Sequence, residues 1–418
     1  MMNVRRLPGY LYRYKARLAV GIALGMTVMY LMHHWGIVCT NREINREIEK
    51  LCNLYKDGKA VGSLCQPLCE DSEIHSISCV TQRSAGYLAF TARWNSRLIL
   101  IKTANAERLS HSGSDAKNVT KSRNTADLFW DTSQFSNPER EQDVETTIRN
   151  LVAERLNLTL TLDQLDLLRY LNTKTRVLYA DSWEGRTAEI KSIFQLLQSQ
   201  EYLLGKLFAD REVFPQVLGT CGHLYGVEYL DTPNFNSVFT LDDKSEWSER
   251  MKLAIAIMDF VEIAETEFPD ALYFCDFHME HLGVTRYGRI KFLEPELVFS
   301  KSIIDSKLKT GRKCEDHRDC DLYNCRSFCS AKDKICDAGV ANDNLQAVCE
   351  RIFIGWTMPG KTIIPGLLMS DFTPASLSAL LRLCAENRRQ AVPEDLRQRL
   401  YTILTEMHQI LTQRLLSE

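Results

Sequence analysis

The sequence lacks an excess of charge of either sign, since 51 basic and 54 acidic residues leave a formal net charge of −3. Without an overall positive field we expect no nucleic-acid partner. Proline and glycine are also scarce, at 11 and 20 of 418 residues, which excludes collagen-like and low-complexity chains. At 45% hydrophobic residues, the chain is long enough for about two or three globular domains.

One segment near the N-terminus can cross a membrane. No Asp, Glu, Lys or Arg occurs between Leu18 and Val38, and a helix of that length spans about 31 Å, close to a hydrocarbon core of roughly 30 Å. Residues 1–17 carry basic side chains and no acidic ones. The positive-inside rule places this tail in the cytosol and the rest of the chain in the lumen of the secretory pathway. A cleaved signal peptide is the alternative, and the length of the basic segment 1–17 before the apolar run argues against it.

The 14 cysteines fall mainly into two groups, one in residues 39–79 and one in residues 314–349. The lumen is oxidising, so such groups form disulfides. A zinc site requires closely spaced pairs of ligands, and the second group has few. We therefore predict disulfides rather than a metal site, with their connectivity open.

The first cysteine group lies in residues 39–85, which we predict to be a disulfide-held cap rather than a helix or sheet layer. Beyond the cap, Asn118 and Asn157 begin Asn-x-Thr sequons, which predict N-glycosylation. Both features agree with a luminal location.

A hairpin and a helix stand out in the next part of the chain. Residues 87–94 and 97–103 are rich in aromatic and β-branched residues and predict two strands joined by a turn, with Lys102 near the end of the second. Residues 187–208 predict one helix whose apolar stripe contains Glu201. A buried carboxylate needs a cationic partner or a wet cleft, unless Glu201 lies at the edge of the stripe and reaches solvent.

The remaining elements follow in a defined order. We predict strands over 214–218, 224–230, 272–274 and 289–293, and helices over 250–266, 377–383 and 395–415. This order of elements is that of a protein kinase: a lysine on a strand, a carboxylate in a helix, two strands, a helix, and then an aspartate after a short strand. Cys275, His278 and His281 are also spaced like part of a zinc site, which is an alternative interpretation of the loop after Phe274.

The chain resembles the divergent protein kinase domain 1 family, also called family with sequence similarity 69. The resemblance rests on the N-terminal anchor, Lys56-Asp57-Gly58, Cys65 and Cys69, residues 196–198 and 219–225, Cys275-Asp276 and the cysteine run 314–336. It implies a type II membrane protein of the endoplasmic reticulum with an α+β, two-lobed, protein-kinase-like fold. Its regions would be a tail 1–17, an anchor 18–38, the cap 39–85, an N-lobe 86–230 with an insertion over about 105–186, and a C-lobe 231–418 with a cysteine-rich insert 314–349.

The resemblance also implies the site residues. Lys102 would hold the nucleotide phosphates and Glu201 would pair with it, while Asp276 would be the catalytic base. Glu228 and Leu230 would lie in the hinge that binds the nucleotide.

His281 and Glu294 would stand at the metal positions, where kinases have Asn and Asp. The resemblance implies ATP with Mg or Mn as the cofactor. Magnesium prefers oxygen ligands, and imidazole is a poorer ligand for magnesium but is acceptable to manganese. The phosphate-covering loop is also poor in glycine, with only Gly86 between Cys79 and Lys102. Of the EF-hand-like loop that the family has over residues 178–189, only Glu189 is retained, so we expect no calcium.

Two functions therefore remain open. One is ATP-dependent phosphoryl transfer to luminal or secreted proteins, and the other is a pseudokinase that acts as a luminal binding or scaffold module. A disulfide-rich interaction protein on an unrelated fold is a third possibility.

Overall fold

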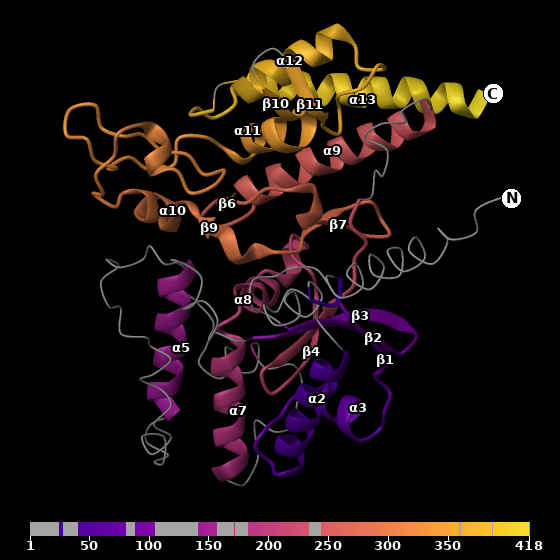
Figure 1. The fold of residues 1–418 in the computed structure, drawn as a ribbon, viewed down its shortest axis with the longest axis vertical. Coiled ribbons are helices and arrows are strands. Elements are labelled where there is room, and N and C mark those ends of the chain that lie inside the picture. The colour runs from indigo at the N-terminus through magenta and orange to yellow at the C-terminus, as the bar shows by residue number, and fades with distance from the viewer. Residues whose placement is uncertain are drawn as a thin grey trace, which may run out of the picture.

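A computed structural model gives the fold of the chain. The structure describes residues 25–27, 41–80, 88–104, 141–156, 171, 183–233, 244–358, 361–386 and 388–417. In these residues the chain forms an N-terminal lobe around a five-stranded sheet and a mostly helical C-terminal lobe, which occupy the lower and upper halves of Figure 1.

The sheet of the N-terminal lobe is antiparallel, with strand order β1-β2-β3-β5-β4. Its strands are β1 (His75–Cys79), β2 (Ala89–Trp94), β3 (Arg97–Thr103), β4 (Val217–Cys221) and β5 (Leu224–Glu228). Strands from both sides of the long segment 105–182 thus lie next to each other, because β3 pairs with β5.

The predicted hairpin is confirmed by β2 and β3. Asn95 and Ser96 form its turn with φ angles of 49° and 62°, and two successive positive values are typical of the two-residue turns that fit the twist of a hairpin. On the other side of β3, Lys102 is in register with Tyr225 of β5. The pairing therefore places these two residues side by side.

The prediction that the cap contains no helix or sheet layer was wrong. Helix α2 (Asn41–Lys56) buries Ile44 and Leu51, and Ile48 packs against the same cluster. These residues step by four and three positions, a helical period that the cysteine content obscured. The cap also supplies β1, an edge strand of the sheet.

Disulfides join the cap to itself and to the sheet. Cys52 of α2 pairs with Cys69 of α3 (Cys65–Cys69), and Cys65 pairs with Cys221 at the end of β4. One hydrophobic cluster contains side chains of both α2 and the sheet. Cap and sheet thus share a core.

Three helices follow β3 in the described part of the chain: α5 (Glu141–Leu156), α7 (Trp183–Leu196) and α8 (Gln200–Leu207). The prediction of one helix over 187–208 was wrong, because the helix is interrupted at Ser199. Ser199 is extended and its side chain accepts a hydrogen bond from the Tyr202 amide, so it caps a new helix.

The C-terminal lobe contains the remaining α-helices and strands and one π-helix. They are α9 (Lys244–Thr266), β6 (Leu272–Phe274), β7 (Leu282–Val284), β8 (Ile290–Phe292), β9 (Val298–Ser300), α10 (Lys301–Leu308), α11 (Asn344–Val348), the π-helix η9 (Cys349–Ile354), β10 (Gly355–Met358), β11 (Lys361–Pro365), α12 (Ala375–Glu386) and α13 (Glu394–Ser417). The predicted strands over 272–274 and 289–293 and the predicted C-terminal helices are confirmed. The largest hydrophobic cluster joins α9, α12 and α13 to side chains of α7 and α8.

The second cysteine group forms a disulfide-rich insert between α10 and α11, the coil at the left of the upper lobe in Figure 1. Its bonds are Cys314–Cys329, Cys320–Cys336 and Cys275–Cys325, and Cys349–Cys384 joins η9 to α12. This confirms disulfides over metal, and it contradicts the zinc interpretation of Cys275.

Some predictions lie outside the described residues: most of the segment from Leu18 to Val38, both sequons, Gly86 and residues 178–182 of the EF-hand-like loop. Within the described ranges, no helix combines the length and apolar character that crossing a bilayer requires. From Trp183 onward, the EF-hand-like segment belongs to α7.

Candidate active site

Lys102 and Glu201 form a buried ion pair. Lys102 lies at the end of β3 and Glu201 in the first turn of α8. The Lys102 Nζ is 2.6 Å from Glu201 Oε2, and the two side chains are only 7% and 1% exposed. The predicted partners, which are far apart in the sequence, thus meet in the core of the N-terminal lobe.

Charge stabilises both members of this pair. Burial acts to lower the pKa of Lys102, but the carboxylates of Glu201, Glu296 and Glu294 outweigh it, so the net shift is upward and the amine stays protonated. The break at Ser199 gives α8 its own N-terminus, whose positive end favours the Glu201 carboxylate. The interruption of the helix therefore has an electrostatic effect at the site.

A buried tyrosine completes the environment of Glu201. The Tyr225 hydroxyl donates to Glu201 Oε2 at 3.1 Å and accepts from Ser199 Oγ at 2.9 Å. Burial raises the pKa of Tyr225 well above its usual value, so the phenol stays a neutral donor. Sequence reasoning missed Tyr225, although its register opposite Lys102 would have identified it once β3 and β5 were paired.

Asp276 lies in the loop between β6 and β7, on the C-terminal side of the site. Its Oδ1 is 2.9 Å from His278 Nε2, and these side chains are 29% and 48% exposed. Its backbone carbonyl lies 2.9 Å from His281 Nδ1. Asp276 is thus solvent-accessible and has an imidazole at its carboxylate, a neighbour to which the sequence had given only a zinc interpretation.

His281 and Glu294 lie close together, as their predicted metal roles require. Their nearest atoms, His281 Nε2 and Glu294 Oε2, are 3.5 Å apart. A carbonyl can only accept, so the Nδ1 that faces Asp276 O carries the proton, and a neutral imidazole keeps the lone pair on Nε2. One nitrogen and one carboxylate oxygen at this separation fit a divalent cation that tolerates imidazole, such as manganese.

Leu293 connects the two halves of the site through its backbone. Its amide donates to the His281 carbonyl at 2.8 Å, and its carbonyl accepts from Lys102 Nζ at 3.4 Å. The structure therefore brings Lys102, Glu201, His281 and Glu294 to one place. Asp276 joins them through its bond with His281.

Glu296 is a further acidic residue that sequence reasoning missed. Burial and the negative charge of Glu201 raise its pKa to about 7, against the opposing effect of Lys102. Its position two residues after Glu294 was the available signal. The site thus contains three glutamates around a single lysine.

The two hinge residues make contacts between the lobes. Glu228 Oε1 accepts from the Gln216 amide at 2.8 Å and from Lys291 Nζ of β8. Leu230 packs so closely on Gly283 that a Cβ there would lie 2.8 Å from the leucine. The segment thus joins β5 to the C-terminal lobe, and its nucleotide-binding role stays a prediction.

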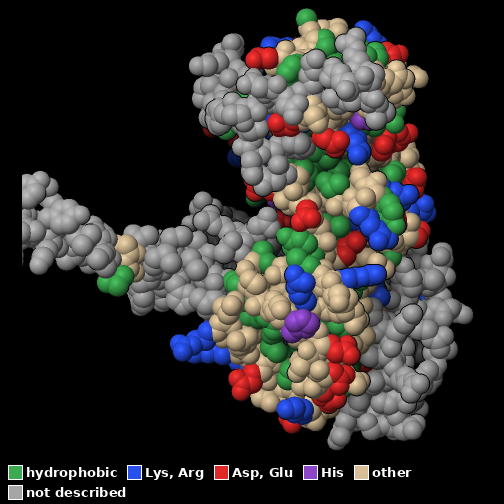
Figure 2. All heavy atoms as spheres, turned by 90° about the vertical axis from the view of Figure 1, so that its right-hand side faces the viewer, with side chains coloured by type: hydrophobic (Ala, Val, Ile, Leu, Met, Phe, Trp, Pro, Cys, Tyr) green, Lys and Arg blue, Asp and Glu red, His purple; other side chains and the backbone are tan. Residues whose placement is uncertain are grey.

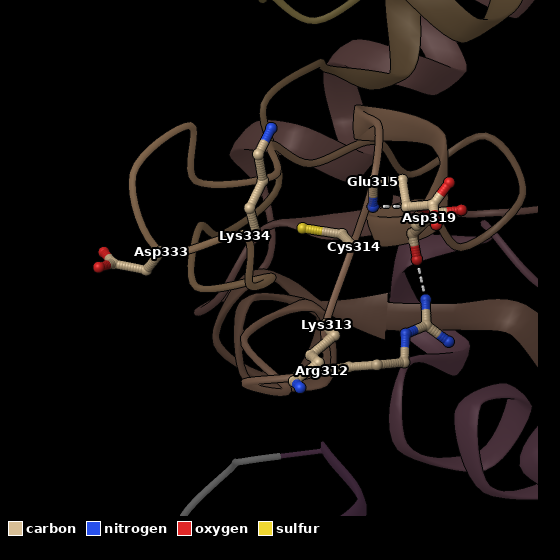
Figure 3. A pocket seen from close by; sticks show the side chains of 7 residues that line it. All are labelled: Arg312, Lys313, Cys314, Glu315, Asp319, Asp333 and Lys334. Atoms are coloured by element: carbon tan, nitrogen blue, oxygen red, sulfur yellow. Dashed lines mark hydrogen bonds between the residues drawn. The ribbon is translucent and has the colours of Figure 1, made fainter.

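A cavity of about 960 Å³ lies in the cysteine-rich insert. Figure 3 shows its lining, which includes Arg312, Asp319 and Lys334. Arg312 donates to the Asp319 carbonyl, and Asp319 Oδ2 accepts from the Glu315 amide at 2.7 Å. The insert thus uses these groups to hold its own loops.

The charge distribution on the surface agrees with the balanced composition. On the face in Figure 2, acidic and basic side chains of the described residues are interspersed over both halves of the molecule.

Comparisons with known proteins identify two family models in the chain. Residues 193–387 match the family model described as the protein-kinase domain of FAM69, and residues 5–171 match the model of its N-terminal cysteine-rich endoplasmic reticulum region. A solved structure, the complex of Rv3197 and erythromycin from Mycobacterium tuberculosis, is 11% identical over 70% of this chain and 66% of that chain, with a TM-score of 0.25. Similarity at this level carries no conclusion.

The two family models and the arrangement of the lobes establish an α+β, kinase-like fold with many disulfides in a protein of the endoplasmic reticulum. This confirms the resemblance seen in the sequence. The chain belongs to the FAM69 (PIP49) family, with an N-terminal cysteine-rich region and a C-terminal protein-kinase domain.

Proposed function

We propose that this protein is a protein-kinase-like phosphotransferase that acts on luminal or secreted proteins. The observation that carries the proposal is the buried Lys102–Glu201 pair, 2.6 Å long and almost inaccessible to water. A bare ion pair of this kind contributes little to stability compared with apolar side chains. Its use is better explained by the alignment of nucleotide phosphates, the role of the corresponding pair in kinases.

The other residues have complementary roles. Asp276 accepts the proton of the substrate hydroxyl, and His278 at 2.9 Å orients its carboxylate. His281 and Glu294 would hold a divalent cation, which when bound supplies positive charge against the phosphates. Glu228 and Leu230 lie in the segment that would contact the base.

The same proposal covers topology. Residues 18–38 anchor the protein in the endoplasmic reticulum membrane, residues 1–17 face the cytosol, and the cap and both lobes are luminal. Asn118 and Asn157 carry N-glycans. Resistance to alkaline extraction and a mobility shift on glycosidase treatment, lost in Asn118→Gln/Asn157→Gln, test these statements.

The activity is tested with the full chain in detergent. ATP with manganese should raise the melting temperature, and Lys102→Ala should abolish the shift, whereas Lys301→Ala, on an exposed pair with Asp305, should keep it. Phosphoryl transfer should fall by at least about 100-fold in Asp276→Asn, as for loss of a general base. Equal transfer by wild type and Asp276→Asn contradicts the proposal.

A pseudokinase scaffold is the second candidate, and the His281–Glu294 contact favours it. His281 Nε2 and Glu294 Oε2 lie only 3.5 Å apart, so the two side chains can interact directly without any metal. In that case ATP binding, if any, is independent of manganese and of EDTA. Manganese-dependent binding that is lost in Glu294→Gln favours the enzyme instead.

A further inference from the structure

The backbone around Asp276 is fixed by the cysteine-rich insert. Asn324 of the insert reaches the loop at two points: its amide donates to the Cys275 carbonyl at 2.7 Å, and its Nδ2 donates to the Phe277 carbonyl at 3.4 Å. These carbonyls belong to the residues immediately before and after Asp276. The insert thus holds Asp276 from both sides.

Asn324 is itself held rigidly. It is only 4% exposed, its Oδ1 accepts from Arg351 Nε of η9 at 3.2 Å, and its carbonyl accepts from Asn342 Nδ2 at 2.9 Å. Every hydrogen-bonding group of Asn324 therefore has a partner. A buried amide whose nitrogen and oxygen are both hydrogen-bonded favours one arrangement, because a displacement leaves polar groups unpaired.

A covalent bond lies beside these hydrogen bonds. Cys325 follows Asn324 and pairs with Cys275, which precedes Asp276, and both cysteines are buried. Tyr323, on the other side of Asn324, has a φ of 52°. A tyrosine rarely adopts this conformation, so the contacts of its neighbours must outweigh the strain.

The strand that leads into the loop is fixed from the opposite side. Asn344 of α11 accepts from the Phe274 amide at 3.0 Å and donates to the Leu272 carbonyl at 2.8 Å. Strand β6 is thus held by α11. The residues that flank Asp276 also contact the core, because the Cys275 amide donates to the Leu297 carbonyl at 2.9 Å and the Phe277 ring is fully buried. Loss of the insert contacts would therefore loosen the loop at the Cys275 and Phe277 carbonyls and leave the strand in place.

We propose that Asn324 and the Cys275–Cys325 disulfide are positioning elements that make the geometry of Asp276 depend on the cysteine-rich insert. The inference deepens the proposed function, on which its kinetic part rests. Small displacements of a reacting group reduce rates strongly. The insert therefore acts on turnover through Asp276, without touching nucleotide.

The test compares two disulfides of the insert in the full chain. Cys275→Ser/Cys325→Ser removes the bond to the loop, and the matched control Cys320→Ser/Cys336→Ser removes an equally buried bond that lies within the insert. The first should lower kcat by about tenfold or more and leave the KM for ATP within about twofold. The control should change kcat by less than about threefold.

A variant of Asn324 separates positioning from support of Arg351. Asn324→Asp keeps an oxygen for Arg351 but loses the donor to the Phe277 carbonyl, so it should reproduce the loss of kcat. If Asn324→Asp transfers phosphate at the wild-type rate, the side chain of Asn324 does not position the loop and the proposal is wrong for it.

Hydrogen exchange tests whether the insert positions the loop, and it does so independently of activity. The amides of residues 275–284 should exchange at least about tenfold faster in Cys275→Ser/Cys325→Ser and in Asn324→Asp than in the control. Equal exchange in both double variants overturns the positioning role even if the enzyme is active. Faster exchange in a protein with no transfer activity supports positioning and overturns only the proposed function.

Discussion

The two halves of the candidate site differ in how completely the protein encloses them. In the N-terminal half, Lys102 and Glu201 are 7% and 1% exposed and sit on a strand and a helix. In the C-terminal half, Asp276 and His278 are 29% and 48% exposed and sit on a loop. The N-terminal half of the site is thus preformed, whereas the C-terminal half is open to solvent and depends on neighbouring residues for its geometry.

The departures from the kinase pattern at the proposed metal positions lie in the C-terminal half. Glu201 keeps a lysine and a tyrosine as partners, while His281 and Glu294 stand at the positions proposed to hold a metal. A substitution beside solvent costs little, but one in the buried pair leaves a charge without compensation. The comparison therefore predicts unequal sensitivity to mutation.

The largest effect is expected from breaking the buried pair. Lys102→Met leaves Glu201 charged and desolvated, so the free energy of unfolding should fall by about 3–5 kcal/mol. Urea denaturation of the full chain measures it. The double variant Lys102→Met/Glu201→Leu should recover much of this loss, since no unpaired charge remains, and a double variant as unstable as the single one would show that packing rather than charge dominates.

A smaller effect on stability is expected at Lys206, which lies in α8 like Glu201. Burial lowers the pKa of Lys206 to about 8, and this lysine has no ion-pair partner among the described residues. Its neutral form is favoured in the folded state, so its destabilising effect is full below pH 8 and disappears as the pH rises toward 10.5. Lys206→Met should therefore stabilise the protein by about 1–2 kcal/mol at pH 7, given its partial exposure.

The pH dependence of that difference is the check. The stability gained by Lys206→Met over wild type should shrink between pH 8 and pH 10.5 in thermal or urea unfolding. A gain that stays constant over this range would mean that Lys206 is not destabilised by its charge.

The smallest effect is expected in the open half. Asp276→Asn removes a charge that is partly solvated and paired with a half-exposed histidine, so the free energy of unfolding should change by less than about 1 kcal/mol. The same urea titration measures it. A loss as large as that of Lys102→Met would remove the contrast between the two halves.

Local patterns predicted much of the fold. The β2–β3 hairpin, the strand before Asp276 and the C-terminal helices each have a period or a turn signal in a short window. The missed features need contacts beyond such a window. The break at Ser199 depends on a cap competing with a continuing apolar stripe, and β1 is recognised as a strand only through its pairing with β2.

The candidate site was predicted in part for the same reason. Glu201 stood out as a carboxylate in an apolar stripe, which left a partner or solvent as alternatives, and the resemblance to kinases then gave it Lys102 as a partner. Tyr225 and Glu296 were missed because their importance comes from residues that are remote in sequence. Tyr225 lies in register with Lys102, and Glu201 and Lys102 act on the pKa of Glu296.

Composition and spacing alone determined that this is a cysteine-rich, charge-balanced chain with the ordered parts of a kinase, because those properties are written in consecutive residues. Only the tertiary structure decided which cysteines pair, that Asn324 hydrogen-bonds to the loop of Asp276, and that Lys102 contacts Glu201 where both are buried. Disulfides and buried charges depend on distances in space between residues that are remote in sequence, and the packed core sets those distances.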